Sequence, residues 1–224
     1  MYWALFIAVA VLSYAVQAFF QKKFKEASEL PLLNGMRGCD VARQMLADHG
    51  IRDVKVISTD GQLTDNYNPT NQTVNLSEAV YGQDSVAAAA VAAHECGHAV
   101  QHARGYIPVK IRTALVPVVS LSAKVVPFVL LAGMLLINTL PQIMWVGILL
   151  FAATTLFSFV TLPVEIDASR RAIAWMEEKD IVDPSNQDAA RGALRAAAYT
   201  YVIAALSSLA TLIYYLSIFS GRRN

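Results

Sequence analysis

Apolar residues in this chain gather in long blocks separated by polar segments. The first block, residues 1–20, holds no charged side chain, and as a helix it would be about 30 Å long, the thickness of a hydrocarbon core. A second block, residues 114–164, is too long for one span and divides at a polar, proline-containing turn at 138–142. A third block runs from about 196 to 219. The pattern predicts four transmembrane helices, at roughly residues 2–20, 115–137, 142–163 and 197–219.

The distribution of basic residues predicts how these spans are oriented. Fifteen of the eighteen Lys and Arg residues lie between the first and second spans or between the third and fourth. Because cytosolic segments carry the excess of Lys and Arg, we expect both polar segments in the cytosol and both termini outside. Lys22, Lys23 and Lys25 follow the first block and no basic residue precedes it, which favours an uncleaved anchor over a signal peptide. Lys124, inside the second span, is expected to snorkel or to face the bundle interior.

The fold class that follows is mainly α: a polytopic membrane protein with four transmembrane helices and a small cytosolic α+β module. A hydrophobic content of 55% excludes disorder, and a net charge of +1 argues against nucleic-acid binding. The lipid bilayer is therefore the expected surrounding. The predicted segments are an N-terminal transmembrane helix (1–20), a cytosolic segment (21–112), a transmembrane hairpin (113–163), a second cytosolic segment (164–196) and a C-terminal transmembrane helix (197–219).

The first cytosolic segment alternates helix and strand patterns. Gly50 and Gly105 are each placed to end a helix, and Asp84-Ser85 is placed to begin one. Turns are expected at Asp60-Gly61 and at 68–71. The predicted elements are a helix over 36–49, strands over 53–58 and 72–76, and a helix over 85–105.

The last of these helices carries the HExxH pattern, His94-Glu95-Cys96-Gly97-His98. Side chains four residues apart share a helix face, so both imidazoles can bind one zinc ion at about 2.0–2.1 Å. Glu95 is turned about 100° from His94, beside the expected metal-bound water, and would act as the general base. Cys96 is expected to be a packed residue. The pattern predicts a catalytic zinc, and the alternative is a polar helix patch with satisfied histidines.

A catalytic zinc needs a third protein ligand and an open fourth position. His102 shares the face of His94 but would lie about 12 Å away along the helix, too far for one tetrahedral site. Glu165 is the predicted third ligand, at the point where the third span ends and a new helix is expected to start. Asp167 competes with it, but two residues apart on a helix they point to nearly opposite faces, and Glu165 shares its face with Ser169. Because two spans separate His98 from Glu165, both residues are expected on one side, close to the membrane.

The chain resembles the bacterial membrane zinc metallopeptidases of the YugP type, a neutral zinc metallopeptidase family. The matching stretches are GCDVARQMLADHGIRDVKV, LTDNYNPTNQTVNLSEAVY, SVAAAAVAAHECGHAVQHARGY and LPVEIDASRRA, together with the four apolar spans. The Glu165 segment is also similar to the Glu-x-x-x-Asp motif of gluzincins of the HtpX and CAAX-protease type, with Ser169 in place of the Asp. The resemblance implies endopeptidase activity in a bacterial inner membrane. By the same analogy, strand 72–76 would lie beside the active-site helix and bind an extended substrate along its edge.

We therefore predict a membrane zinc endopeptidase with one zinc ion per chain, held by His94, His98 and Glu165, with Glu95 as general base. A protein or peptide is the expected substrate, cut in membrane-proximal or unfolded segments. The alternative is a non-catalytic membrane scaffold or regulatory protein with a structural zinc site. His102, Ser169 and Tyr106 are expected to surround the metal or face the substrate. The donor that would stabilise the oxyanion stays open among Tyr106, His102, Tyr67 and Arg170.

Overall fold

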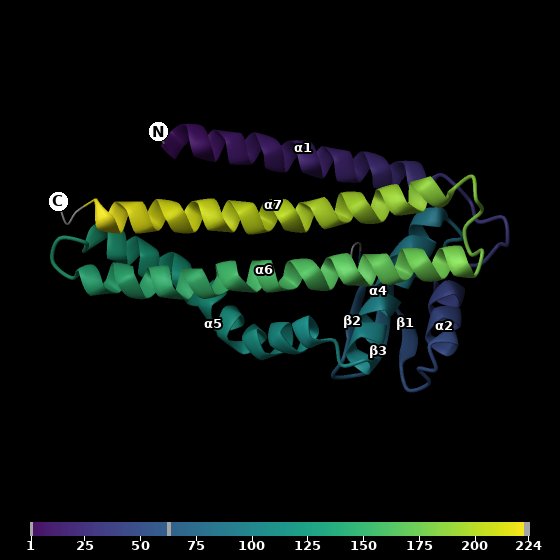
Figure 1. Cartoon of the computed structure of the whole chain (residues 1–224). Coiled ribbons are helices and arrows are strands. Elements are labelled where there is room, and N and C mark those ends of the chain that lie inside the picture. Colours follow the sequence, from purple (N-terminus) through teal and green to yellow (C-terminus); the bar gives the residue numbers. More distant parts are fainter. Residues whose placement is uncertain (1, 62–63, 222–224) are drawn as a thin grey trace.

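The computed structural model describes residues 2–61 and 64–221. Four long helices and a small three-stranded sheet with short helices around it make up this part of the chain (Figure 1). The predicted fold class, mainly α with a small α+β module, is confirmed. In chain order the elements are α1 (Tyr2–Ser28), α2 (Gly38–Asp48), β1 (Lys55–Thr59), β2 (Asn66–Asn68), β3 (Thr73–Ser77), α3 (Glu78–Tyr81), α4 (Val86–Ala103), α5 (Ile107–Leu135), α6 (Pro141–Glu178) and α7 (Gln187–Ser220).

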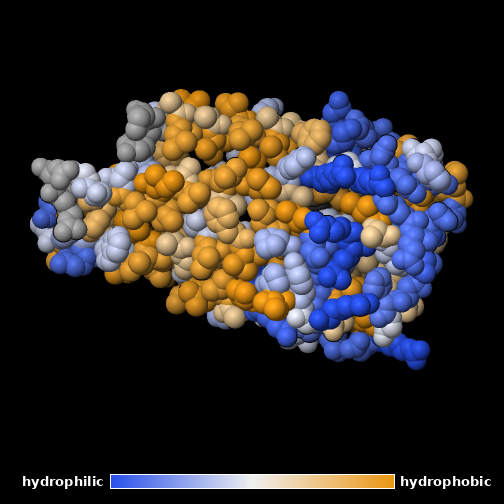
Figure 2. All heavy atoms as spheres, viewed as in Figure 1, coloured by the Kyte–Doolittle hydropathy of each residue, from blue (hydrophilic) through white to orange (hydrophobic). Residues whose placement is uncertain are grey.

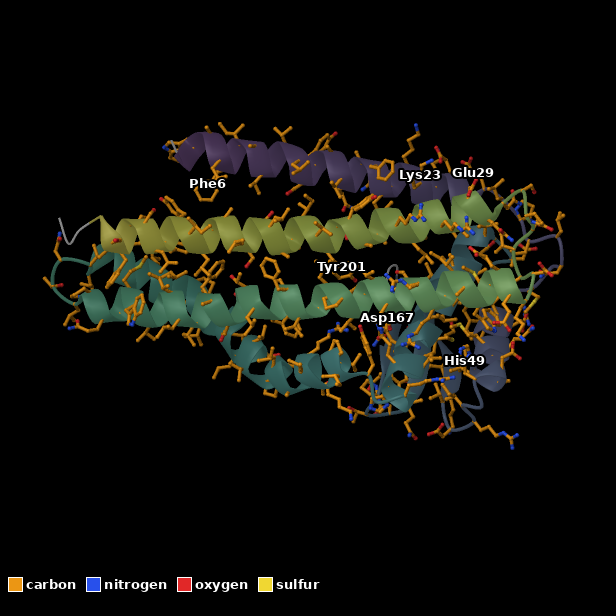
Figure 3. The ribbon with its side chains drawn as sticks, viewed as in Figure 1. Phe6, Lys23, Glu29, His49, Asp167 and Tyr201 are labelled. Carbon is orange, nitrogen blue, oxygen red and sulfur yellow. The ribbon has the colours of Figure 1, made fainter. Side chains whose placement is uncertain are left out.

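The four long helices α1, α5, α6 and α7 are each long and apolar enough to cross a membrane. The face of these helices seen in Figure 2 is largely hydrophobic, and hydrophilic residues gather at the end of the molecule that carries the sheet. The start of α1 and the end of α7 lie together at the opposite end (Figure 1). There Phe6 of α1 packs edge-on against Tyr214 of α7, whereas Lys23 and Glu29 lie at the end of α1 toward the polar end of the molecule (Figure 3). The helices therefore form a bundle with one apolar half and one polar end.

The second long helix, α5, is the bent member of the bundle. Pro117 and Pro127 lie inside it, and α5 turns away from α6 along its first half (Figure 1). Because a proline removes one helical hydrogen bond and crowds the preceding turn, these two residues account for the bend. Lys124, between them, is exposed on the helix surface. That position suits a side chain that snorkels rather than one that faces the bundle interior.

The third long helix, α6, does not stop at the membrane boundary. The expectation that a new helix starts near Glu165 is wrong, because α6 continues without a break from Pro141 through Pro163 to Glu178. Pro163 removes one backbone donor, which a helix tolerates where neighbouring helices pack against it, and α4 and α7 both contact α6. One rigid element thus carries Glu165 from the apolar half of the bundle into the polar half.

The three strands form a sheet in the order β1-β3-β2, with β3 parallel to β1 and antiparallel to β2. The short strand β2 was not predicted. The turn that joins it to β3 is stabilised by Asn68, whose side-chain oxygen accepts hydrogen bonds from the N–H groups of Thr70 and Asn71 at 2.9 and 3.2 Å. Since β3 is paired on both sides, it has no free edge. The expected substrate edge at residues 72–76 is therefore wrong: the edge strands are β1 and β2, and β2 is the one that contacts α4.

Helix α4 lies at the centre of this polar end. It packs against α2, α6 and α7, and its alanine-rich first half is almost completely buried. Ser85 caps it by accepting a hydrogen bond from the Ala88 N–H at 3.2 Å, and Gly105, with φ at +64°, follows its end. We call α2, α3, α4 and the three strands the sheet module. Its core holds α4 in a fixed position against the long helices.

Candidate metal centre

Two helices bring three candidate ligands together. His94 and His98 lie on one face of α4, and Glu165 of α6 faces them. The Glu165 Oε2 atom is 3.3 Å from His94 Nε2 and 3.5 Å from His98 Nε2, and one ligand atom from each residue lies within 4.8 Å of the other two. In a tetrahedral zinc site with bonds of about 2.0–2.2 Å, neighbouring ligand atoms are separated by roughly 3.3–3.5 Å. Both distances to Glu165 agree with this separation, so the three side chains could hold a zinc ion.

The close approach of α4 to α6 depends on Gly97. A Cβ atom at this position would lie 2.6 Å from the Ala168 carbonyl oxygen, a distance that real contacts do not reach. Only a glycine therefore lets the backbones come this near without a shift. The contact lies between the two histidines and one turn from Glu165, so it sets the distance between the ligands on the two helices.

The Nδ1 atom of each histidine has its own partner. Ser169, one turn after Glu165 on α6, places its Oγ 3.1 Å from His94 Nδ1. Ser169 is 7% exposed. A hydrogen bond on Nδ1 fixes the orientation of an imidazole and directs the Nε2 lone pair at a metal. Ser169, expected near the metal from its position in the sequence, makes this contact with His94.

His98 is oriented by Gln101, a completely buried residue of α4. The Gln101 side-chain NH2 group donates to the Val164 carbonyl and to Asp167 Oδ2, both at 2.8 Å. Its Oε1 is therefore the atom that faces His98 Nδ1, at 3.1 Å, and can only accept a hydrogen bond. Nδ1 must carry the proton, which leaves Nε2 free to bind a metal.

Charged neighbours offset the burial of His98 and Glu165. Burial by itself lowers the pKa of His98, but its contact with the Glu165 carboxylate and the charge of Glu95 outweigh this and raise it. Arg112, at the start of α5, places its Nη1 3.4 Å from Glu165 Oε1, the oxygen that does not face the histidines. The Glu165 side chain is 4% exposed, so this cation offsets the cost of burying its charge.

Asp167 is not part of the three-residue cluster. Its Oδ2 accepts from Arg171 Nε at 2.6 Å as well as from Gln101. The two acidic residues thus divide their tasks, because Glu165 faces the histidines whereas Asp167 holds Gln101 in place.

Glu95 is held beside the cluster by the edge strand. It is 8% exposed, and its Oε2 accepts a hydrogen bond from the backbone N–H of Tyr67 in β2 at 3.0 Å. The carboxylate is therefore buried next to His94 without joining the three candidate ligands. It therefore lies between α4 and β2.

The other residues singled out in the sequence lie farther from the cluster. His102 Nδ1 lies 3.3 Å from the Tyr67 hydroxyl, and the Tyr106 ring stacks against the Arg171 guanidinium at 5.8 Å. Arg170 is exposed. Cys96 is buried with its Sγ 3.4 Å from the Ala42 carbonyl, and burial raises the pKa of its thiol, so it is a packed residue as expected.

Sequence reasoning missed three residues near the centre. Gln101 carries a weak signal, since it lies three residues after His98 and so shares its side of the helix. Arg112 was used only as one of the basic residues that indicate orientation. Tyr201 lies in the last apolar block, and nothing in the sequence connects it to His94. The structure places it on the wall of the same cavity as His94, Glu95 and Glu165.

A cavity of about 710 Å³ adjoins the cluster. Its walls come from α1, α4 and α7, with a smaller contribution from the end of β3 and from α3. His94, Glu95 and Glu165 all line it. Its volume falls within the range of about 300–1,000 Å³ that is usual for ligand-binding pockets. The candidate metal centre is thus accessible from a space large enough for part of a polypeptide.

The fold and the centre define a class of protein: a polytopic membrane protein with two partly buried histidines and a buried glutamate that could together hold a metal ion. Residues 2–220, nearly the whole chain, match the family described as "Putative neutral zinc metallopeptidase", and the chain belongs to this family. It is 38% identical over 222 residues to a protein of Bacillus subtilis named "Putative membrane protease YugP", and the match covers 98% of each chain. No solved structure matches it.

Proposed function

We propose that this protein is a zinc-dependent endopeptidase that hydrolyses peptide bonds at the boundary of the membrane. His94, His98 and Glu165 would hold one zinc ion per chain. A zinc ion there supplies a Lewis acid and lowers the pKa of a bound water toward about 7. The observation that carries the proposal is the place of Glu95, a buried carboxylate next to His94 on the wall of a large cavity. A purely structural metal site needs neither the carboxylate nor the cavity.

The protein's own groups have distinct tasks in this reaction. Glu95 accepts a proton from the attacking water and returns it to the amine that leaves. Ser169 and Gln101 keep the two imidazoles in one orientation. Arg112 offsets the charge of Glu165. For the oxyanion donor we propose Arg112, which contacts Glu165, and Tyr201, which lines the same cavity as Glu165, ahead of the four earlier candidates.

The substrate chain would lie in extended form along β2. This strand forms the edge of the sheet on the side of α4, and its Tyr67 N–H already points to Glu95. A strand added to this edge would place a peptide carbonyl next to the general base, and backbone hydrogen bonds would give affinity without a strict sequence requirement. We propose β2 for this task in place of β3.

We further propose that the centre faces the cytosol of a bacterial cell, with both chain termini on the other side of the inner membrane. The basic residues near the sheet module support this orientation. Substrates would then be membrane proteins with exposed cytosolic segments, or unfolded chains close to the bilayer. The alternative function is a scaffold in which zinc only ties α4 to α6.

The experiment that separates these functions is the Glu95→Gln substitution in the purified, zinc-loaded protein. The amide keeps the size and the hydrogen bond from Tyr67 but cannot accept a proton. We expect cleavage of an unfolded test protein, such as casein, to fall at least about a hundredfold, within the usual contribution of a general base. Bound zinc should stay close to one equivalent. Glu78→Gln, in the short helix α3, is the matched control and should cleave like the wild type. Equal cleavage by wild type and Glu95→Gln would contradict the mechanism.

A further inference from the structure

The cavity beside the metal centre is longer than a pocket for one side chain requires. On α1 it is lined by residues that recur every three or four positions and so form one helix face: Gln17, Phe20, Gln21, Phe24, Lys25 and Ser28. From Gln17 to Ser28 this face covers about 16 Å at 1.5 Å per residue. An extended chain rises about 3.3 Å per residue, so the cavity can hold four or five consecutive residues.

The opposite walls carry many small residues beside Val91 and Leu194. Helix α7 contributes Ala193, Ala197 and Ala198, and α4 contributes Ala87, Ala88 and Ala90. Alanine side chains on two helices leave the space that larger residues would fill, and the phenylalanine rings of α1 cover it from one side. Ala197 and Ala198 are only half-buried although they lie between helices, which agrees with an open space next to them.

The two ends of the cavity differ. His94, Glu95, Glu165 and Tyr201 line one end, and Ser28, Gln83 and Ser85 line the other. The first end lies at the level of the apolar blocks, since Tyr201 belongs to the last block and Glu165 follows the third. The second end lies near the chain crossing where Pro31 pairs with Ser85. A chain lying in the cavity would therefore pass from the membrane level, past the metal centre, into the polar half of the protein.

We infer that this cavity binds a stretch of four or five apolar residues of the substrate, on one side of the bond to be cut. This inference rests on the proposed function and names its substrate class: chains with consecutive large apolar residues, as occur where a transmembrane segment meets the aqueous phase. Ala197, Ala198, Phe20 and Phe24 determine this preference. The polar residues at the far end, Ser28 of α1 together with Gln83 and Ser85 between α3 and α4, receive the segment that follows the apolar stretch.

Binding is tested separately from cleavage. The full-length Glu95→Gln protein, loaded with zinc in nanodiscs, is mixed with a ten-residue peptide that contains five leucines, one of them a photo-reactive leucine. After illumination, mass spectrometry locates the cross-links. We expect them in residues 17–28 of α1 and 193–201 of α7. A peptide with serine at the five leucine positions should compete about tenfold less well, the effect of roughly 1.4 kcal/mol of lost binding. Cross-links confined to the lipid-facing surface would overturn the inference.

The matched pair of variants is Ala198→Leu and Ala204→Leu. Both add the same side chain to α7, but Ala198 lines the cavity whereas Ala204 is exposed on the helix surface and does not. We expect Ala198→Leu to reduce cross-linking about tenfold and Ala204→Leu to leave it within about twofold. Zinc content shows that each variant is folded. Should Ala198→Leu not fold, Phe20→Ala, which widens the cavity, should allow peptides with tryptophan in place of leucine to compete more strongly than they do in the wild type.

A cleavage assay with a peptide library completes the test. The wild type should cut next to runs of large apolar residues, and Ala198→Leu should shift the cuts toward runs of alanine and glycine. Cross-linking in the cavity without any cleavage by the wild type would refute the proposed peptidase activity and leave the binding site established. Cleavage without an apolar preference, or with the same preference in Ala198→Leu, would refute the inference and leave the peptidase activity intact.

Discussion

Among single residues, Gln101 is not a candidate ligand, but it determines the orientation of one candidate ligand, His98. Its NH2 group is held by two acceptors, so its oxygen can only accept a hydrogen bond from His98. This arrangement selects one tautomer of the imidazole. Removing it would let the ring rotate and would leave Nδ1 without an acceptor in a buried place.

We therefore expect Gln101→Met, which keeps the length of the side chain, to weaken zinc binding about 10- to 100-fold, as is typical for the partner of a metal-binding histidine. Competition with a chelator of known affinity measures this change. Gln44→Met, at an exposed position of α2, is the control and should bind zinc like the wild type. If Gln101→Met retained wild-type affinity, the hydrogen bond to His98 would have no part in holding the metal.

The three candidate ligands could be found by sequence reasoning, whereas the residues that contact them could not. His94 and His98 are four residues apart on one helix, and Glu165 follows an apolar span, so local patterns identify all three. The contacts of Gln101 with Val164 and of Arg112 with Glu165 join residues more than fifty positions apart. No periodicity in the sequence predicts such contacts, because they depend on how α4, α5 and α6 pack.

Between elements, the decisive feature is the contact of α4 with α6 at Gly97. An alanine here would favour the helix by up to about 1 kcal/mol, but its methyl group would overlap the Ala168 carbonyl. Overpacking of this kind costs about 1–3 kcal/mol. We expect Gly97→Ala to lower the unfolding temperature and to weaken zinc binding, since the two helices must separate.

Gly192→Ala provides the matched comparison for this prediction. Gly192 also lies inside a long helix, but the nearest atom to its added methyl group is the Lys23 Cδ at 3.5 Å, an ordinary contact. This variant should be as stable as the wild type or slightly more so, with unchanged zinc binding. Thermal unfolding and chelator competition on both variants decide the matter, and equal behaviour of the two would show that close approach at Gly97 is unimportant.

The elements themselves illustrate where sequence patterns succeed. The spans, α2 and α4 follow from long apolar or capped patterns, and the structure contains all of them. The three-residue strand β2 is too short for a periodic signal, and its pairing with β3 depends on a turn. Local sequence patterns also do not predict that α6 continues through Pro163, because packing by neighbouring helices overrides the tendency of proline to end a helix.

For the whole molecule, the candidate metal centre is the link between the sheet module and the bundle. Two candidate ligands belong to α4 and one to α6, so a bound zinc ion would add a further bond between helices that already meet through packing and through the hydrogen bonds of Gln101 and Ser169. Zinc present at a thousand times its dissociation constant stabilises the folded state by about 4 kcal/mol. Removing it with a chelator should lower the unfolding temperature by roughly 5–15 °C.

Hydrogen exchange adds a spatial readout to this measurement. Without zinc, exchange should increase in α4 around His94–His98 and in α6 around Glu165, and less in α1. Glu165→Ala should show a low unfolding temperature that does not respond to the chelator. A wild-type protein with the same unfolding temperature before and after zinc removal would contradict a linking role for the metal.

Because α6 is uninterrupted, it also fixes the distance between Glu165 and the far end of the apolar half of the bundle. The distance along its axis from Pro141 to Glu165 is about 36 Å, and no loop in this stretch can lengthen or shorten it. In a thinner or thicker bilayer, α6 must then tilt as a whole, because the backbone near Glu165 cannot change its length locally. The position of the candidate metal centre relative to the lipid is therefore fixed by the length of one helix.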